Sequence, residues 1–140
     1  MNSPGYHVIK VALENPGAAR FVFGAQKTMY GGKDIATGDV IYIFDSEHDG
    51  GAGLVARGVV TSAAAVPRKR TLERQTPRVN ITVRRTARAK KPFGRTELKP
   101  FTDWKDGQPR TELNFKFYRQ ATNKIGGISA AAAAFLDGFF

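Results

Sequence analysis

The sequence of 140 residues contains no cysteine, two histidines, one tryptophan and only 12 acidic residues against 22 lysines and arginines. Without cysteine, disulfide scaffolds, thiolate zinc sites, iron–sulfur clusters and cysteine nucleophiles are excluded. Long apolar runs are also missing, because stretches such as Val40 to Phe44 and Ala130 to Leu136 fall well short of the ~20 residues that cross a bilayer. Met1 to Gly5 carries no charged and apolar leader. We therefore expect a soluble cytoplasmic protein with no membrane partner.

Apolar residues are nevertheless plentiful enough for a core. The chain has ten Phe and four Tyr, and 41% of its residues are hydrophobic, which disfavours disorder. The length suits one domain, and no repeat or linker divides the chain. We expect residues 1–140 to form a single domain, a monomer or weak dimer that folds without metal or cofactor.

The net charge of +10 is concentrated in one third of the chain. Twelve basic and two acidic residues lie between Arg68 and Lys99, which leaves ten of each elsewhere. A solvated charged face is one interpretation, but solubility needs only scattered charge, whereas a clustered excess attracts phosphate backbones. The residues predicted to contact a nucleic-acid backbone are Arg68, Lys69, Arg70, Arg78, Arg84, Arg85, Arg88, Lys90 and Lys91.

The first half of the chain predicts a strand, a short helix and then two further strands. Tyr6 to Leu13 is rich in strand-forming residues, and Asn15 is placed to cap a helix over residues 18–23. Asp39 to Asp45 is apolar almost throughout, which is typical of a strand buried on both faces. Leu54 to Ser62 follows a glycine-rich turn, so the two runs predict a hairpin, and Gly58 marks a bulge or a close backbone approach.

The second half predicts two more strands and a terminal helix. Val79, Ile81 and Val83 alternate with polar residues, and so do the apolar residues between 113 and 118. Residues 96–98 predict a helical turn, and Ser129 is placed to cap a helix that runs through Leu136. The pattern therefore indicates an α/β (α+β) fold: a small mixed barrel of five to six strands with short flanking helices.

No catalytic or metal motif stands out. The loop from Asp45 to Gly50 is similar to a calcium loop, but Ala56 occupies the position of the closing carboxylate. A triad of Ser46 with His7 or His48 has no supporting spacing. We therefore expect no metal and no enzyme activity.

Four segments in order resemble the PUA-like superfamily, and in particular its EVE branch, which is related to the YTH and ASCH domains. They are HVIKV with ENP from His7 to Pro16, GDVIYIFDS from Gly38 to Ser46, GLVARGVV from Gly53 to Val60, and FKFYRQ from Phe115 to Gln120. The resemblance implies a pseudobarrel that takes a modified base of DNA or RNA into an aromatic-lined pocket. The residues that it assigns to this pocket are Lys10, Tyr30, Tyr42, Phe44, Ser46, Arg119 and Gln120.

Three functions remain open at this point. The first is a nucleic-acid-binding domain that reads a modified base beside a basic face. The second is an ASCH-like small-ligand or hydrolytic protein that uses Lys10, Asp45 and His48 in the same pocket. The third is an adaptor that binds RNA by charge alone. Trp104 either covers one end of the core or stacks on a base.

Overall fold

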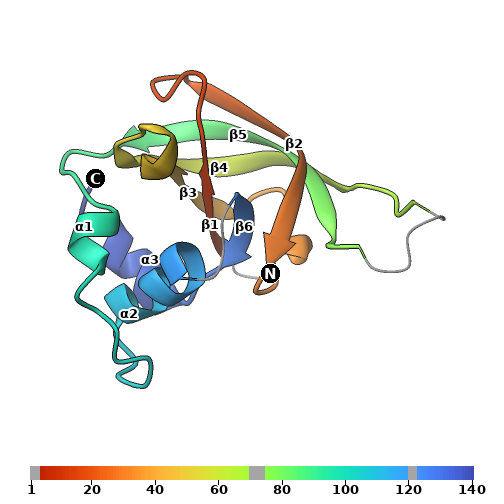
Figure 1. Ribbon diagram of the computed structural model, residues 1–140. Helices are drawn as coiled ribbons and strands as arrows, with labels where there is room; N and C mark the ends of the chain where they lie inside the picture. Colours follow the sequence, from red (N-terminus) through yellow and green to blue (C-terminus); the bar gives the residue numbers. More distant parts are fainter. Residues whose placement is uncertain (1–3, 70–74, 120–122) are drawn as a thin grey trace.

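The computed structural model describes residues 4–69, 75–119 and 123–140. Within these residues six strands close into a barrel in the order β1-β3-β4-β5-β2-β6 (Figure 1). The pairs β1–β3 and β2–β6 are parallel, and the other four are antiparallel. The strands are β1 (Tyr6–Val11), β2 (Arg20–Met29), β3 (Val40–Asp45), β4 (Gly53–Ala65), β5 (Arg78–Arg88) and β6 (Lys124–Gly127).

Short helices gather on one side of the barrel, and the outer part of the β4–β5 hairpin projects from the other side (Figure 1). No helix in the described ranges is long and apolar enough to cross a membrane. The α-helices are α1 (Arg95–Leu98), α2 (Pro109–Asn114) and α3 (Ala130–Asp137). Helix α2 continues into a π-helical turn, η3 (Phe115–Arg119). Two short 3-10 helices are η1 (Gly32–Asp34) and η2 (Glu47–Asp49).

Strand β3 separates two hydrophobic cores. Ile41 and Ile43 point into the barrel, where they meet apolar residues of the other strands. Val40, Tyr42 and Phe44 point the other way, into a second core that the helices complete. This arrangement explains why β3 is apolar at nearly every position, and it confirms the prediction of a central strand buried on both faces.

Several other predictions are confirmed. Strands β3 and β4 pair as a hairpin, and the register shifts at Gly58, where a Cβ atom would lie 2.8 Å from the carbonyl oxygen of Arg84. The Ser129 side chain accepts a hydrogen bond from the Ala132 amide and caps α3. Strand β5 alternates as expected, and the predicted turn near residues 96–98 is α1. The predicted fold class, an α+β fold built on a small mixed barrel with short flanking helices, is confirmed.

The predicted helix over residues 18–23 is wrong, because β2 begins at Arg20. Phe21 and Phe23 point into the barrel while Val22 between them is 71% exposed, which is the period of a strand. Asn15 caps a turn instead, where its side chain accepts from the Gly17 amide at 3.2 Å. Pairing with β5 outweighed the local helix signal.

The predicted strand over residues 113–118 is also wrong, because this segment is helical. Pro109 occupies the first turn of α2, a position that favours helix initiation. Leu113 and Phe117 lie four residues apart and are both buried in the helix-side core. The alternation of apolar residues therefore concealed a spacing that suits a helix equally well.

Candidate functional site

The outer surface of β2 and β5 carries like charges in register. Arg78, Arg84 and Arg88 of β5 are exposed, and Arg20 and Lys27 of β2 lie opposite Arg84 and Arg78. Like charges directly opposite one another destabilise a sheet, and the ion pairs found within the described part of the chain include none of these five residues. These residues form an uncompensated cationic surface, which we call the basic face.

The remaining residues predicted to contact a nucleic-acid backbone differ in their surroundings. The Arg85 guanidinium donates to the carbonyl oxygens of Gly17 and Ala18 at 2.6 and 2.9 Å, so it holds the loop before β2. Lys90 and Lys91 are exposed just after β5, and Arg68 and Lys69 are exposed after β4. Arg70 lies outside the described residues.

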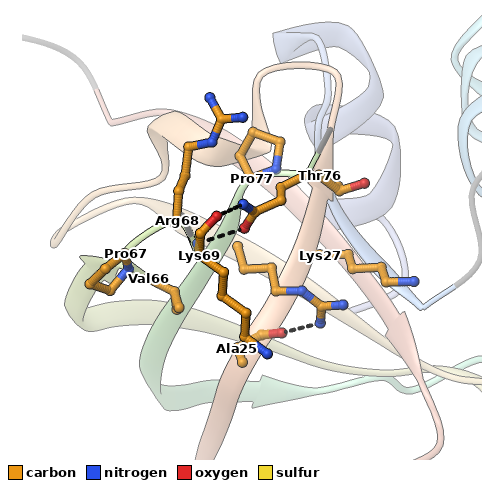
Figure 2. Close-up of a pocket in the computed structure, with 10 residues that line it drawn as sticks. Ala25, Lys27, Val66, Pro67, Arg68, Lys69, Thr76 and Pro77 are labelled. Atoms are coloured by element: carbon orange, nitrogen blue, oxygen red, sulfur yellow. Dashed lines mark hydrogen bonds between the residues drawn. The ribbon is translucent and has the colours of Figure 1, made fainter. Parts of the chain in front are cut away.

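Arg68 and Lys69 border a hollow of about 500 Å³ at the connection between β4 and β5 (Figure 2). The Gln75 side-chain amide accepts from the Lys69 amide at 3.0 Å and donates to its carbonyl oxygen at 2.5 Å, so it joins the two arms of the hairpin. Figure 2 shows the side chains of Arg68 and Lys69 extending in opposite directions from the backbone. Lys27 and Arg78 of the basic face line the same hollow.

A second hollow, of about 220 Å³, is lined by aromatic and polar residues of α2, of the loop before it and of η3. Trp104 and Phe115 form two of its walls with ring centroids 5.5 Å apart, and the Trp104 indole is 38% exposed. The Arg119 guanidinium lies 4.8 Å from the centroid of the Trp104 ring. Tyr30, directly after β2, contacts the Phe115 ring. Two predicted pocket residues therefore lie against the aromatic walls of this Trp104 hollow: Arg119 against Trp104, and Tyr30 against Phe115.

Glu112 is the acidic group of the Trp104 hollow. Burial alone would raise the pKa of Glu112, but hydrogen bonds from Ser129 and the charge of Lys116 outweigh it and lower the pKa below 4.5. Its Oε2 accepts from the Ser129 amide and from Lys116 Nζ, and its Oε1 accepts from the Ser129 hydroxyl. A carboxylate has about four acceptor sites, and the described residues fill three of those of Glu112, two on Oε2 and one on Oε1.

Lys10 of β1 lies beneath the helices and is 7% exposed. Its Nζ donates to the carbonyl oxygen of Phe117 and stands 4.1 Å from the centroid of the Tyr118 ring. Burial lowers the pKa of Lys10, and the nearby Glu47 carboxylate opposes this effect. Burial raises the pKa of Tyr118, and its hydroxyl donates to Glu47 Oε1 at 2.8 Å. Lys10 is thus a buried cation whose partners anchor η3 to the barrel.

The other predicted pocket residues on β3 are buried in the same region. Phe44 is the Cα partner of Lys10, is 2% exposed and meets the rings of Phe93 and Tyr118 edge-on. Tyr42 is fully buried and its hydroxyl donates to Asp137 Oδ1 at 2.6 Å. Ser46 is buried at the end of β3. The structure brings Lys10 and Phe44 together but places them apart from the Trp104 hollow, and Gln120 lies outside the described residues.

The polar groups of the alternative ligand site do not share a contact within the described residues. Lys10 bonds to Phe117, Asp45 accepts from the Leu13 amide at 3.0 Å, and His48 is exposed in η2. His7 pairs instead with Asp39, with His7 Nε2 3.0 Å from the carboxylate. No group of three potential metal ligands occurs in the part of the chain that the structure describes.

Sequence reasoning missed several residues of these sites. Phe115 and Tyr118 were expected on a strand, and the pair Leu113 and Phe117 was the signal that could have placed them on a helix. Lys27 and Arg20 lie outside the basic third of the chain, so only the strand register brings them to the basic face.

No family model matches the sequence, and no curated protein matches it. Solved structures do match. Human THYN1, crystallised in complex with DNA that contains 5-methylcytosine, is 14% identical with a TM-score of 0.64, over 95% of this chain and 96% of that chain. This chain has the fold of the DUF55 domain. The DUF55 domain of human thymocyte nuclear protein 1 itself is 12% identical with a TM-score of 0.61, over 94% of this chain and 95% of that chain.

A hypothetical protein from Leishmania major is similar to the same extent, with 15% identity and a TM-score of 0.62 over 97% of this chain and 94% of that chain. At this level of identity the likeness concerns the fold. The resemblance to EVE-type PUA-like domains is confirmed at that level.

Proposed function

We propose that this protein binds nucleic acid through its basic face and takes a modified base into the Trp104 hollow. The observation that carries the proposal is the register of like charges, with Arg20 opposite Arg84 and Lys27 opposite Arg78. Such pairs destabilise the sheet, and a bound polyanion would neutralise them. The complex of THYN1 with DNA containing 5-methylcytosine supports this class of partner for the DUF55 fold.

The chemistry of the Trp104 hollow suits an unstacked base. A base needs aromatic or guanidinium planes to stack on and a few fixed polar groups at its edge. Trp104, Phe115 and Arg119 offer the planes. The fourth acceptor site of Glu112 suits the exocyclic amino group of cytosine or adenine, and Lys116 suits a base carbonyl.

In this proposal the buried residues Lys10 and Phe44 do not contact the base but support the turn η3 beside it. Lys10 holds the carbonyl oxygen of Phe117, and Phe44 packs against Tyr118, so both fix the turn η3 that carries Phe115 and Arg119. The proposal is one of binding without catalysis.

The experiment measures binding of oligonucleotides that differ only in one base, unmodified, 5-methylcytosine or N6-methyladenine, in DNA and in RNA. Trp104→Ala should weaken binding of the preferred modified oligonucleotide about 5- to 150-fold, because stacking contributes ~1–3 kcal/mol per base. Phe101→Ala, which removes a ring from the same loop outside the hollow, is the matched control. The double variant Arg20→Ala/Arg84→Ala should weaken binding of every oligonucleotide alike and reduce its salt dependence.

The outcomes separate the competing functions. Binding that depends on salt but does not distinguish modified from plain bases would favour the adaptor that binds by charge alone. It would contradict the proposal that a modified base enters the Trp104 hollow. A parent protein that binds no oligonucleotide at low salt would overturn the nucleic-acid function altogether.

A further inference from the structure

Three cations lie in register across three adjacent strands of the barrel. Lys27 of β2 is the Cα partner of Arg78 in β5 on one side and of Lys124 in β6 on the other. Directly paired residues point to the same face of a sheet, here the outer one, because the following residue of β2, Thr28, is buried. We call Lys27, Arg78 and Lys124 the cation row.

Two hollows meet at this row. One is the hollow of about 500 Å³ at the connection between β4 and β5 (Figure 2), and the other, of about 420 Å³, extends toward Asn123 and Lys124. They share Ala25, Lys27 and Arg78, and no acidic residue of the described ranges lines either. Both therefore present a positive surface of the kind that binds anions.

The backbone of β2 fixes the row in place. Ala25 has a positive φ of 47° and the β2–β5 register shifts between Phe23 and Gln26, so the strand bulges here. The freed carbonyl oxygen of Ala25 accepts from Arg78 Nη1 at 2.8 Å, which holds this guanidinium at the boundary between the two hollows. The Gln26 side chain donates to the carbonyl oxygen of Asn123 and ties β2 to the start of β6.

The cation row and the Trp104 hollow are joined by the same two strands. Tyr30 follows Lys27 by three residues and contacts Phe115. Gly127 follows Lys124 by three residues, and its carbonyl oxygen accepts from Lys116 of the hollow at 2.9 Å. At ~3.3 Å per residue, the row stands about 10 Å along each strand from Tyr30 and Gly127, which contact Phe115 and Lys116 of the hollow.

We infer that the cation row is a phosphate site, which binds backbone phosphates of the same nucleic-acid strand whose base enters the Trp104 hollow. The inference rests on the proposed function and specifies its geometry. Arginine presents a planar fork that matches phosphate oxygens, and lysine adds a compact charge. Neutralising the row with phosphate also removes the repulsion among its three members.

The test measures how the binding constant of an oligonucleotide containing 5-methylcytosine changes with salt. Each phosphate contact contributes about 0.9 to the slope of log K against log salt for duplex DNA and about 0.7 for a single strand. Lys27→Ala and Lys124→Ala should each reduce the slope by about this amount. Lys99→Ala removes the same charge from an exposed position at the end of α1 and should leave the slope almost unchanged.

The failures of the two proposals are distinguishable. If the parent binds with a steep salt dependence and the variants of the cation row keep its full slope, the assignment of the row as a phosphate site is overturned while the proposed function stands. If the parent binds no oligonucleotide, the proposed function fails and the row is tested with tripolyphosphate alone. Tripolyphosphate should then raise the melting temperature of the parent more than that of Lys27→Ala/Lys124→Ala, and an equal rise overturns the row. A poly-glutamate peptide that acts as strongly as tripolyphosphate overturns the phosphate assignment.

Discussion

Lys10 and Lys27 both lie in strands of one barrel, yet their surroundings are opposite. Lys10 is buried on the helix-covered side, where a carbonyl oxygen, an aromatic ring and a nearby carboxylate compensate its charge. Lys27 is exposed on the open side between two further cations. A buried charge that has partners within the protein helps to hold the folded structure together. Charges of one sign that lie side by side on the surface are available to a ligand of opposite sign.

The largest effect is expected on the helix-covered side. Phe44→Ala should lower the free energy of unfolding by about 3–5 kcal/mol, because the ring is buried and packs between Phe93 and Tyr118. Urea denaturation measures this loss, and the exposed Val22→Ala should change it by no more than about 0.5 kcal/mol. Binding of unmodified oligonucleotides per folded molecule should stay the same, because the basic face lies on β2 and β5. A stable Phe44→Ala variant with weakened binding of the modified base would instead place Phe44 in the base site.

Replacement by methionine should change the free energy of unfolding in opposite directions at Lys10 and at Lys27. Lys10→Met should lower the free energy of unfolding by about 1–3 kcal/mol, because the buried carbonyl oxygen of Phe117 loses its donor. Lys27→Met should raise it by about 0.2–1 kcal/mol at low ionic strength, because it relieves repulsion within the cation row. Thermal unfolding at low salt and at 1 M salt measures both changes.

High salt is the control for this comparison, since it screens exposed charges but affects buried pairs less. The gain from Lys27→Met should vanish at 1 M salt, while the loss from Lys10→Met should persist. A destabilised Lys27→Met variant at low salt would mean that the row is compensated within the fold, and the contrast between the two sides would fail.

The smallest effect concerns acid stability at the Trp104 hollow. The pKa of Glu112 is lowered in the folded protein, so its carboxylate stabilises the fold above its ordinary pKa of 4.5, and this contribution is lost as the pH falls below that value through the lowered folded pKa. Glu112→Gln should therefore be less stable than the parent at pH 7 and closer to it at pH 3. Urea denaturation at the two pH values measures the difference, and a gap that does not narrow in acid would contradict the assignment.

The strands that were predicted correctly from the sequence are those whose apolar pattern fits a strand and no other element. Continuous burial in β3 and strict alternation in β5 each specify a strand. The two errors, at residues 18–23 and 113–118, fell where local signals conflicted with pairing or packing partners far away in the chain. Pairing across the barrel is not encoded by local spacing, so propensity alone could not decide them.

The candidate site was predictable to the extent that charge clusters along the chain. Arg78, Arg84 and Arg88 were identified because they belong to the basic third of the sequence. Lys27 and Lys124 are separated from Arg78 by dozens of residues and come together only through the register of β2, β5 and β6. The Trp104 hollow depended on recognising η3 as helical, so Phe115 could not be assigned to it in advance.

Closure of the barrel depends on its shortest strand. The four residues of β6 lie between β1 and β2 and are separated from β1 by more than a hundred residues in the chain. Until this segment docks, β1 and β2 each present an unpaired edge, which is a template for association with other chains. Contacts between such distant segments also form slowly. Any form of the sheet without β6 therefore carries two edges open to association, and the pairing of β6 removes both at once.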